Sequence, residues 1–202
     1  SNTLESKVFD LGPLTLTAGT IIFPLAYLFN DILTEVYGYA AARRVIWTGF
    51  AAMILMSVFY ALAVAIPPGA MWDGQEAYAA TLGVVPRIAF ASVIAYFCGE
   101  FINSYIVAKM KIASQGKKMG LRFVASTIAG EAVDTVIFMA IAFTGVFAFD
   151  ELVTVGASMW VAKVGWEVAA LPLTLFIVKK LKEAEHEDHY DTNTNFNPFT
   201  IG

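Results

Sequence analysis

The stretch Val45–Ile66 reads VIWTGFAAMILMSVFYALAVAI and contains no charged side chain. A helix rises about 1.5 Å per residue, so a run of this length crosses the hydrocarbon core of a bilayer, which is about 30 Å thick. The run therefore predicts an α-helix that spans a membrane.

The composition of the whole chain agrees with that of a membrane protein. Apolar residues of the set AVILMFWYC make up 58% of the 202 residues, charged residues make up 15%, and the mean hydropathy is +0.65. A soluble domain has about 45–50% apolar and about 25% charged residues. A water-soluble globule of this length and composition would expose large apolar patches. We therefore expect an all-α, polytopic bundle of helices in a lipid bilayer.

Five stretches are long enough to be spans. Leu11–Phe29 is again free of charges, whereas three later stretches contain charges within them. With their flanks, the five predicted spans cover about residues 11–38, 45–66, 84–108, 122–149 and 152–179. They form one membrane domain of residues 1–182. The acidic residues of 183–202 predict a hydrophilic cytoplasmic tail, in which His186 and His189 are solvated.

Basic residues in the short loops predict the orientation. Arg43 and Arg44 follow the first span, five basic residues lie between 109 and 122, and Lys179–Lys182 follows the fifth span. These ends are predicted to be cytoplasmic, the C-terminus included, in a cell inner membrane. Five spans then place Ser1 outside, and we expect a sixth, N-terminal span in the full-length protein.

Charge, cysteine content and motifs exclude several classes of function. The chain has 13 Lys+Arg against 17 Asp+Glu, which rules out a basic nucleic-acid binder held by phosphate contacts. Cys98 is the single cysteine, so no disulfide framework and no cysteine-built metal site is expected. The sequence contains neither the GxxxxGK[ST] pattern of an ATPase nor the HExxH pattern of a metalloprotease. We predict no catalytic residue, no cofactor and no metal.

Nine polar residues lie within or at the ends of the predicted spans. An ionisable group there costs at least about 2.5–3.5 kcal/mol at the helix centre, which makes it a functional candidate. Spacings of three or four residues place each set on one helical face. Counted from the basic helix ends, most lie roughly 12–18 Å deep, and we predict that they line one central cavity. They are Asn30, Asp31 and Glu35 in the first span, Glu100 and Asn103 in the third, Glu131 and Asp134 in the fourth, and Lys163 and Glu167 in the fifth.

Two of these sets share the pattern G-E-x-x-[ND]-[ST], at Gly99–Ser104 and Gly130–Thr135. A small residue lets a neighbouring backbone approach closely, and paired elements of this kind occur where transporter halves meet. Gly19, Pro24 and Pro172 interrupt predicted helices. Such breaks free backbone groups that need a cavity, water or a ligand as partner. For Pro172 alone we prefer a packing kink.

Six carboxylates against Lys163 cannot all be ionised at low dielectric. Either the site holds a ligand rich in N–H donors, or the carboxylates carry protons as the coupling ion. The structural alternative is an ion pair between Lys163 and Glu167 along one helix. Aromatic residues near the acids are suited to stacking a flat heterocycle. They are Tyr27, Phe29, Phe97, Phe101, Tyr105, Phe138, Trp160 and Trp166.

The stretch Phe23–Gly38, FPLAYLFNDILTEVYG, with Arg43 soon after, resembles the signature of the queuosine-precursor transporter family, also called the vitamin uptake transporter family. The resemblance covers nearly the whole chain, because four further blocks follow in the same order. These blocks are Gly99–Lys111, Arg122–Phe138, Lys163–Glu167 and Asp188–Phe199.

The resemblance implies a six-helix membrane protein that takes up 7-cyano-7-deazaguanine or 7-aminomethyl-7-deazaguanine for making queuosine in transfer RNA. It implies that the nine polar residues bind this substrate. The N1–H and exocyclic amine of a deazaguanine form a donor pair that one carboxylate accepts, with Glu131 or Asp134 as the candidate. Asn30 or Asn103 suits the O6 region. The candidates for a coupling proton or the ammonium group of the aminomethyl form are Asp31 and Glu35.

Two other functions stay open at this point. One is an intramembrane enzyme that uses paired carboxylates as acid and base, although the spread of one acidic cluster per helix argues against it. The other is a substrate-capturing subunit that needs an energising partner. A homodimer is a further expectation, based on Gly49, Gly145 and Gly156 as small contact points.

Overall fold

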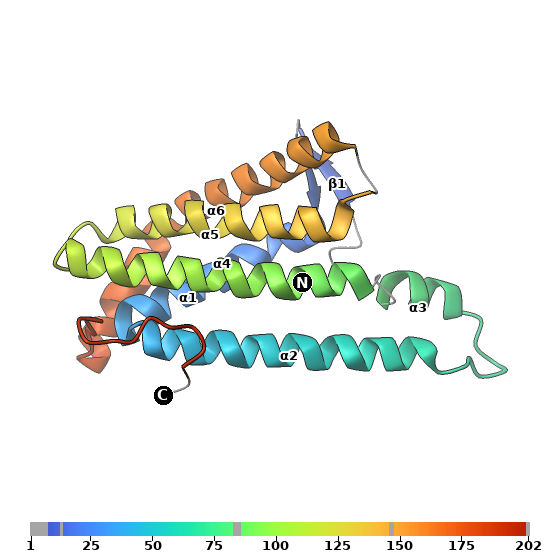
Figure 1. Ribbon diagram of the computed structural model, residues 1–202, viewed down its shortest axis with the longest axis horizontal. Coiled ribbons are helices and arrows are strands. Elements are labelled where there is room, and N and C mark those ends of the chain that lie inside the picture. Colours follow the sequence, from blue (N-terminus) through green and yellow to red (C-terminus); the bar gives the residue numbers. More distant parts are fainter. Residues whose placement is uncertain (1–7, 13, 83–85, 146–147, 201–202) are drawn as a thin grey trace.

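The computed structural model describes residues 8–12, 14–82, 86–145 and 148–200. Long helices dominate it, and Figure 1 shows α2, α4 and α5 as roughly parallel rods. The elements are β1 (Val8–Leu11), β2 (Leu14–Thr17), the 3-10 turn η1 (Ala18–Ile21), α1 (Phe23–Tyr37), α2 (Tyr39–Ala65), α3 (Gln75–Leu82), α4 (Pro86–Ala113), α5 (Met119–Phe143) and α6 (Phe149–Glu185).

Four helices in the described part of the chain are long and apolar enough to cross a membrane. They are α2, α4 from Ile88 onward, α5 and α6. α2 lies at the edge of the bundle and presents Leu55, Phe59 and Leu62 outward. The chain is therefore an all-α, multi-pass membrane protein whose outer apolar surface faces lipid.

The first predicted span, residues 11–38, is not one helix. β1 and β2 form an antiparallel hairpin that pairs Val8 with Thr17, and α1 begins only at Phe23. The alternation of leucine and threonine in β2 favours a strand, and Pro24 favours the first turn of a helix because it has no N–H to donate. α1 has 15 residues and is about 22 Å long, short of the roughly 30 Å core. The described chain thus has four spans where the sequence predicted five.

The other predicted spans coincide with helices whose ends differ from the prediction. α2 begins six residues before residue 45 and so includes Arg43 and Arg44. α6 has 37 residues and continues through Glu185, so the first residues of the predicted tail are helical. The predicted start of the third span at residue 84, residues 146–147 of the fourth, and residues 1–7 lie outside the described residues.

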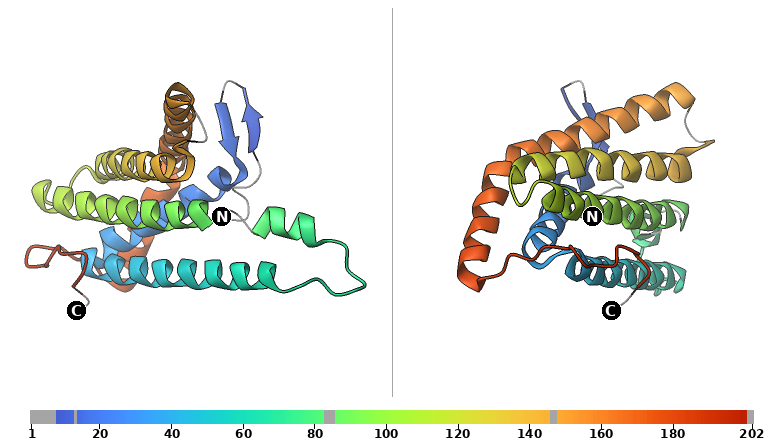
Figure 2. Two further views of the ribbon diagram at one scale, coloured as in Figure 1. Left: turned by 45° about the vertical axis from the view of Figure 1, so that its right-hand side comes forward. Right: turned by 60° about the vertical axis from the view of Figure 1, so that its left-hand side comes forward.

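α6 contains Pro172 in its interior. A proline inside a helix removes a backbone hydrogen bond and bends the helix. Figure 2 shows that α6 changes direction along its length, so that its C-terminal part turns toward α2. The packing kink expected at Pro172 agrees with this path.

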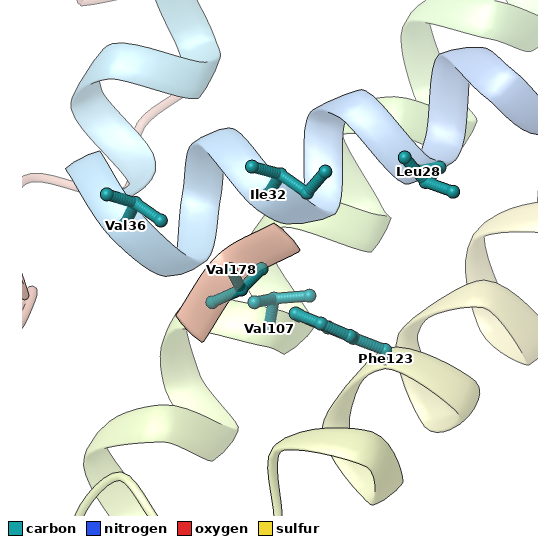
Figure 3. Packing of buried hydrophobic residues seen from close by; sticks show 6 residues of the cluster. All are labelled: Leu28, Ile32, Val36, Val107, Phe123 and Val178. Carbon is teal, nitrogen blue, oxygen red and sulfur yellow. The ribbon is translucent and has the colours of Figure 1, made fainter. Parts of the chain in front are cut away.

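Buried apolar side chains form three clusters, of which one joins α2 to α4 and the other two lie at different heights of the bundle. Of these two, the first joins α1, α4, α5 and α6 near the turn between α4 and α5, and Figure 3 shows its side chains meeting from these helices. The second lies farther toward the start of α4 and the end of α5. The first cluster consists of Leu28, Ile32, Val36, Val107, Phe123 and Val178, and the second of Ala91, Ala95, Phe138, Met139, Ala142 and Met159.

Residues 186–200, which we call the C-terminal strap, fold back over α1, α2 and α4, and most of them stay exposed. Asp191 of the strap is buried, and its Oδ2 accepts a hydrogen bond from the backbone N–H of Tyr39 at 2.9 Å. Arg43 donates to the backbone carbonyls of Asn195 and Asn197, at 2.8 Å each. The strap therefore satisfies polar groups at the start of α2.

Gly38 makes room for the strap between α1 and α2. Its φ of +84° lies in the region that glycine adopts without strain. A side chain at this position would also collide with the ring of His189. His189 donates its backbone N–H to the carbonyl of Val36 at 3.1 Å, which fixes the strap beside the end of α1.

Candidate functional site

All nine predicted site residues are buried, each with at most 6% of its surface exposed. The structure divides them into two groups. Glu35, near the end of α1, belongs to a separate network of ion pairs. The other eight form what we call the central cluster, between α1, α4, α5 and α6. These residues are Asn30, Asp31, Glu100, Asn103, Glu131, Asp134, Lys163 and Glu167.

The central cluster lies between the first and the second of the apolar clusters. On α4, Glu100 and Asn103 lie between Ala95 of the second apolar cluster and Val107 of the first. α5 and α6 repeat this order, with their polar residues flanked on both sides by buried apolar ones. The structure therefore brings polar groups from several helices to one level of the bundle, as the sequence predicts. That these groups line a cavity stays a prediction.

The two G-E-x-x-[ND]-[ST] segments meet where α4 and α5 cross. A Cβ atom added to Gly99 would lie 3.1 Å from the carbonyl oxygen of Gly130, and one added to Gly130 would lie 3.0 Å from the carbonyl oxygen of Gly99. Because real Cβ atoms rarely approach so closely, glycine is what lets the two backbones touch. Tyr27 of α1 packs on the same crossing. The acids that follow the two glycines, Glu100 and Glu131, are thus brought to one level.

Lys163 of α6 forms ion pairs with two carboxylates of α5. Its Nζ lies 2.9 Å from Oε2 of Glu131 and 2.7 Å from Oδ2 of Asp134. The two acids are three residues apart, which places both on the face of α5 that looks toward α6. These ion pairs run between helices, whereas the structural alternative from the sequence was a pair along α6.

Two asparagines connect α1 to α4. Nδ2 of Asn103 donates to Oδ1 of Asp31 at 2.5 Å, and Nδ2 of Asn30 donates to Oγ of Ser104 at 2.8 Å. Each amide uses a donor for this contact. Their oxygens have no hydrogen-bond partner among the residues that the structure describes, so each amide has an acceptor left over.

Other buried oxygens of the central cluster also lack a hydrogen-bond partner within the described ranges. Leaving a buried polar group unpaired costs about 1–3 kcal/mol, and more for a charged one. The arrangement therefore favours a proton, a cation or a ligand with N–H donors. The atoms are Oδ2 of Asp31, both Oε atoms of Glu100 and Oε1 of Glu167, together with the hydroxyl oxygens of Thr127 and Thr135.

Glu35 is held by charged partners from three other parts of the chain. Its Oε2 lies 2.7 Å from Nη2 of Arg122, and its Oε1 lies 2.7 Å from Nζ of Lys182. Nζ of Lys111 donates to the backbone carbonyl of Glu35 at 2.5 Å. Both lysines also pair with Asp188 of the strap, at 2.7 and 2.8 Å. Since both of its carboxylate oxygens are engaged, Glu35 joins helices and strap and is not part of the central cluster.

Sequence reasoning missed the three basic partners of Glu35. The sequence assigns Lys111, Arg122 and Lys182 no role at the site beyond the orientation and, for the first two, the blocks of the resemblance. They are 76, 87 and 147 residues from Glu35 in the chain, so no local spacing relates them. The one available signal was that Glu35 lies closer than the other acids to a basic helix end.

The aromatic residues expected around the site are dispersed. Tyr27 is buried at the crossing of α4 and α5, and Phe138 belongs to the neighbouring apolar cluster. Phe97 and Phe101 pack on each other, with ring centroids 4.7 Å apart, and on Trp47 of α2. The indole N–H of Trp160 donates to the backbone carbonyl of Ile128. The other three, Phe29, Tyr105 and Trp166, are exposed on the outer surface.

A family described as "Putative vitamin uptake transporter" matches residues 17–177. The chain is 27% identical over 176 residues to a "Probable queuosine precursor transporter" of Bacillus subtilis, which covers 87% of this chain and 76% of that protein. It is 32% identical over 127 residues to a "Queuosine precursor transporter" of Escherichia coli, which covers 63% of this chain and 55% of that protein. No solved structure matches.

Proposed function

Because the chain belongs to the vitamin uptake transporter family, we propose that it imports a queuosine precursor, 7-cyano-7-deazaguanine or 7-aminomethyl-7-deazaguanine, across the inner membrane. The names of the relatives support this substrate class. The observation that carries the proposal is the central cluster, where five buried carboxylates and Lys163 meet between four helices. A cluster with that excess of acceptors suits a base rich in N–H groups.

The substrate is proposed to bind between α1, α4, α5 and α6. One carboxylate of the pair Glu131 and Asp134 accepts N1–H and the exocyclic amine of the base, a bidentate contact that charge strengthens. Lys163 then keeps the other carboxylate as its partner. Asn30 or Asn103 donates to O6 after it exchanges its present contact, with Ser104 or Asp31, for one to the base.

Coupling to protons is proposed to act through Asp31. The Glu35 carboxylate is engaged by Arg122 and Lys182, whereas Oδ2 of Asp31 has no partner in the described part of the chain. Protonation of Asp31 lowers the negative charge of the central cluster and supplies a donor. Proton binding and substrate binding then both depend on the same group of acids, which is what coupled transport requires.

The test is uptake of radiolabelled 7-aminomethyl-7-deazaguanine into liposomes that contain the purified chain. We expect saturable uptake that an acidic exterior accelerates and that excess 7-cyano-7-deazaguanine, but not guanine, suppresses. Asp31→Asn is expected to remove the response to the pH gradient. Asp150→Asn, at the exposed start of α6, serves as the matched control and is expected to retain it.

The same experiment separates the alternatives. Binding without uptake in these liposomes would favour a substrate-capturing subunit that needs an energising partner. Recovery of a chemically altered base would favour an intramembrane enzyme. A folded chain that neither binds nor transports any of these bases would overturn the proposal.

A further inference from the structure

Glu100 differs from Asp31, Glu131 and Asp134 of the central cluster in its hydrogen bonding. Its surface is 1% exposed, and both of its carboxylate oxygens are fully buried without a hydrogen-bond partner among the described residues, whereas for Glu167 this holds of Oε1. By contrast, Asp31 accepts from Asn103, and both Glu131 and Asp134 pair with Lys163. Both carboxylate oxygens of Glu100 can therefore accept hydrogen bonds from a ligand.

The charges that act on Glu100 are mainly negative, whereas Glu131 and Asp134 each pair with Lys163. The negative charges come mainly from the carboxylates of Asp31, Glu131 and Asp134. Lys163 is engaged with α5, and the basic residues near Glu35 are engaged with Glu35 and the strap. The local field at Glu100 thus attracts a positive charge supplied from outside the chain.

The two asparagines of the central cluster also offer acceptors. Asn30 donates its Nδ2 to Ser104, and the same Nδ2 lies 3.4 Å from the backbone carbonyl oxygen of Glu100. The side-chain oxygens of Asn30 and Asn103 are unpartnered acceptors in the described structure. A ligand group therefore gains hydrogen bonds to the Glu100 carboxylate and to these amide oxygens only if it is a donor.

We infer that Glu100 is the counter-ion for a positively charged amine on the ligand, so that the site selects an aminomethyl-substituted deazapurine over its cyano form. This inference rests on the proposed function and adds a specificity-determining residue to it. An ammonium group brings three donors and one positive charge, which match the two free oxygens of Glu100. A nitrile is an acceptor without charge and would face carboxylate and amide oxygens.

The inference differs from the expectation drawn from the sequence, which assigned the ammonium group to Asp31 or Glu35. Glu35 is already neutralised by two basic side chains, at 2.7 Å each. Asp31 shares one oxygen with Asn103. Glu100 alone among the three offers both oxygens to a ligand.

The experiment is calorimetric titration of the purified full chain in detergent with 7-aminomethyl-7-deazaguanine and with 7-cyano-7-deazaguanine. The two probes share the base, so the ratio of their dissociation constants isolates the substituent. Because a hydrogen-bonded charge pair is strong, we expect the aminomethyl form to bind about 10- to 100-fold more tightly. Glu100→Gln keeps the size of the side chain and is expected to bring that ratio close to one.

The matched control is Glu183→Gln, the same change at an exposed carboxylate at the end of α6. It is expected to preserve the ratio, and size-exclusion chromatography checks that both variants are folded. Equal binding of the two probes, or retained selectivity in Glu100→Gln, would overturn the role of Glu100 while saturable binding still supports the proposed function. Absence of binding of both probes to the folded chain would overturn the proposed function itself.

Discussion

At the scale of the single residue, the ion pair of Arg122 with Glu35 is buried on both sides, since both side chains are fully shielded from solvent. Removing one partner of such a pair leaves an uncompensated buried charge, which typically costs about 3–5 kcal/mol. Lys182 stays beside Glu35, so we expect Arg122→Gln to lower the free energy of unfolding by about 3 kcal/mol. Denaturant unfolding in detergent micelles, followed by tryptophan fluorescence, measures this change.

The control for Arg122→Gln is an exposed pair of the same molecule. Lys179 lies 4.0 Å from Glu183, and both side chains are more than half exposed. Surface pairs contribute about 0–1 kcal/mol, so Lys179→Gln is expected to leave unfolding nearly unchanged. A double variant, Arg122→Gln with Glu35→Gln, should recover part of the loss because the charge of Glu35 is removed together with that of Arg122, while Lys111 and Lys182 keep Asp188 as a partner. If Arg122→Gln and Lys179→Gln changed the free energy of unfolding equally, the ion-pair network around Glu35 would not stabilise the fold more than a surface pair does.

At the scale of the element, the contact between α4 and α5 depends on Gly99. An alanine Cβ there would lie 2.9 Å from Cβ of Asp134 and 3.1 Å from the backbone of Gly130. Because overpacking typically costs about 1–3 kcal/mol, we expect Gly99→Ala to destabilise the protein by that amount and to weaken binding of the deazapurine. Unfolding and calorimetry measure the two effects. Gly165→Ala on α6 meets no atom within 4 Å, and it is expected to be neutral or to stabilise by about 0.5–1 kcal/mol.

The C-terminal strap has a pH dependence of its own, set by Asp188. Burial raises the pKa of Asp188, but hydrogen bonds from Lys111 and Lys182 outweigh burial and hold the pKa below its usual value. A lowered pKa in the folded state means that the ion pairs stabilise the strap fully above the unfolded value of about 3.9 and are lost as pH falls through the lowered value. We therefore expect the strap to stay docked from pH 7 to about pH 4 and to loosen below that.

Fluorescence anisotropy of a dye on Asn193→Cys, in a Cys98→Ser background, reports the docking of the strap. Asp188→Asn is expected to give the loosened signal already at pH 7. Glu187→Gln, the exposed neighbour, is the control and should retain the acid transition. An unchanged anisotropy in Asp188→Asn would show that other contacts, such as those of Arg43 with the strap, suffice to hold it.

At the scale of the whole molecule, the sequence predicted what depends on composition and periodicity. Apolar length identified α2, α4, α5 and α6, and three- and four-residue spacings identified the acids that face one another. It did not identify α1 as a short helix, because an apolar run alone does not distinguish a hairpin and a turn from a span. The partner of Lys163 on α5 and the network of Glu35 depend on contacts between distant segments, which no local pattern encodes.

The structure also makes the orientation of the whole molecule in the membrane testable. Figure 1 shows the turn between α4 and α5 and the strap at one end of the bundle, and α3 at the other. Basic residues gather at the first end, for example at Lys117, Lys118 and Lys180. Because basic ends stay in the cytoplasm, we expect the strap to be cytoplasmic and the loop before α3 to face outward.

Two single-cysteine variants, made in the Cys98→Ser background, distinguish the two sides of the membrane. Met71 lies fully exposed in the loop before α3, and Lys180 is exposed near the end of α6. With a maleimide that does not cross membranes, Met71→Cys is expected to react in intact spheroplasts and Lys180→Cys only after permeabilisation. Both sites are exposed, so a difference in labelling reports the side of the membrane and not burial. The reverse pattern would place the network of Glu35 at the outer end, and the acidic exterior proposed to drive import would then meet that network before it meets Asp31.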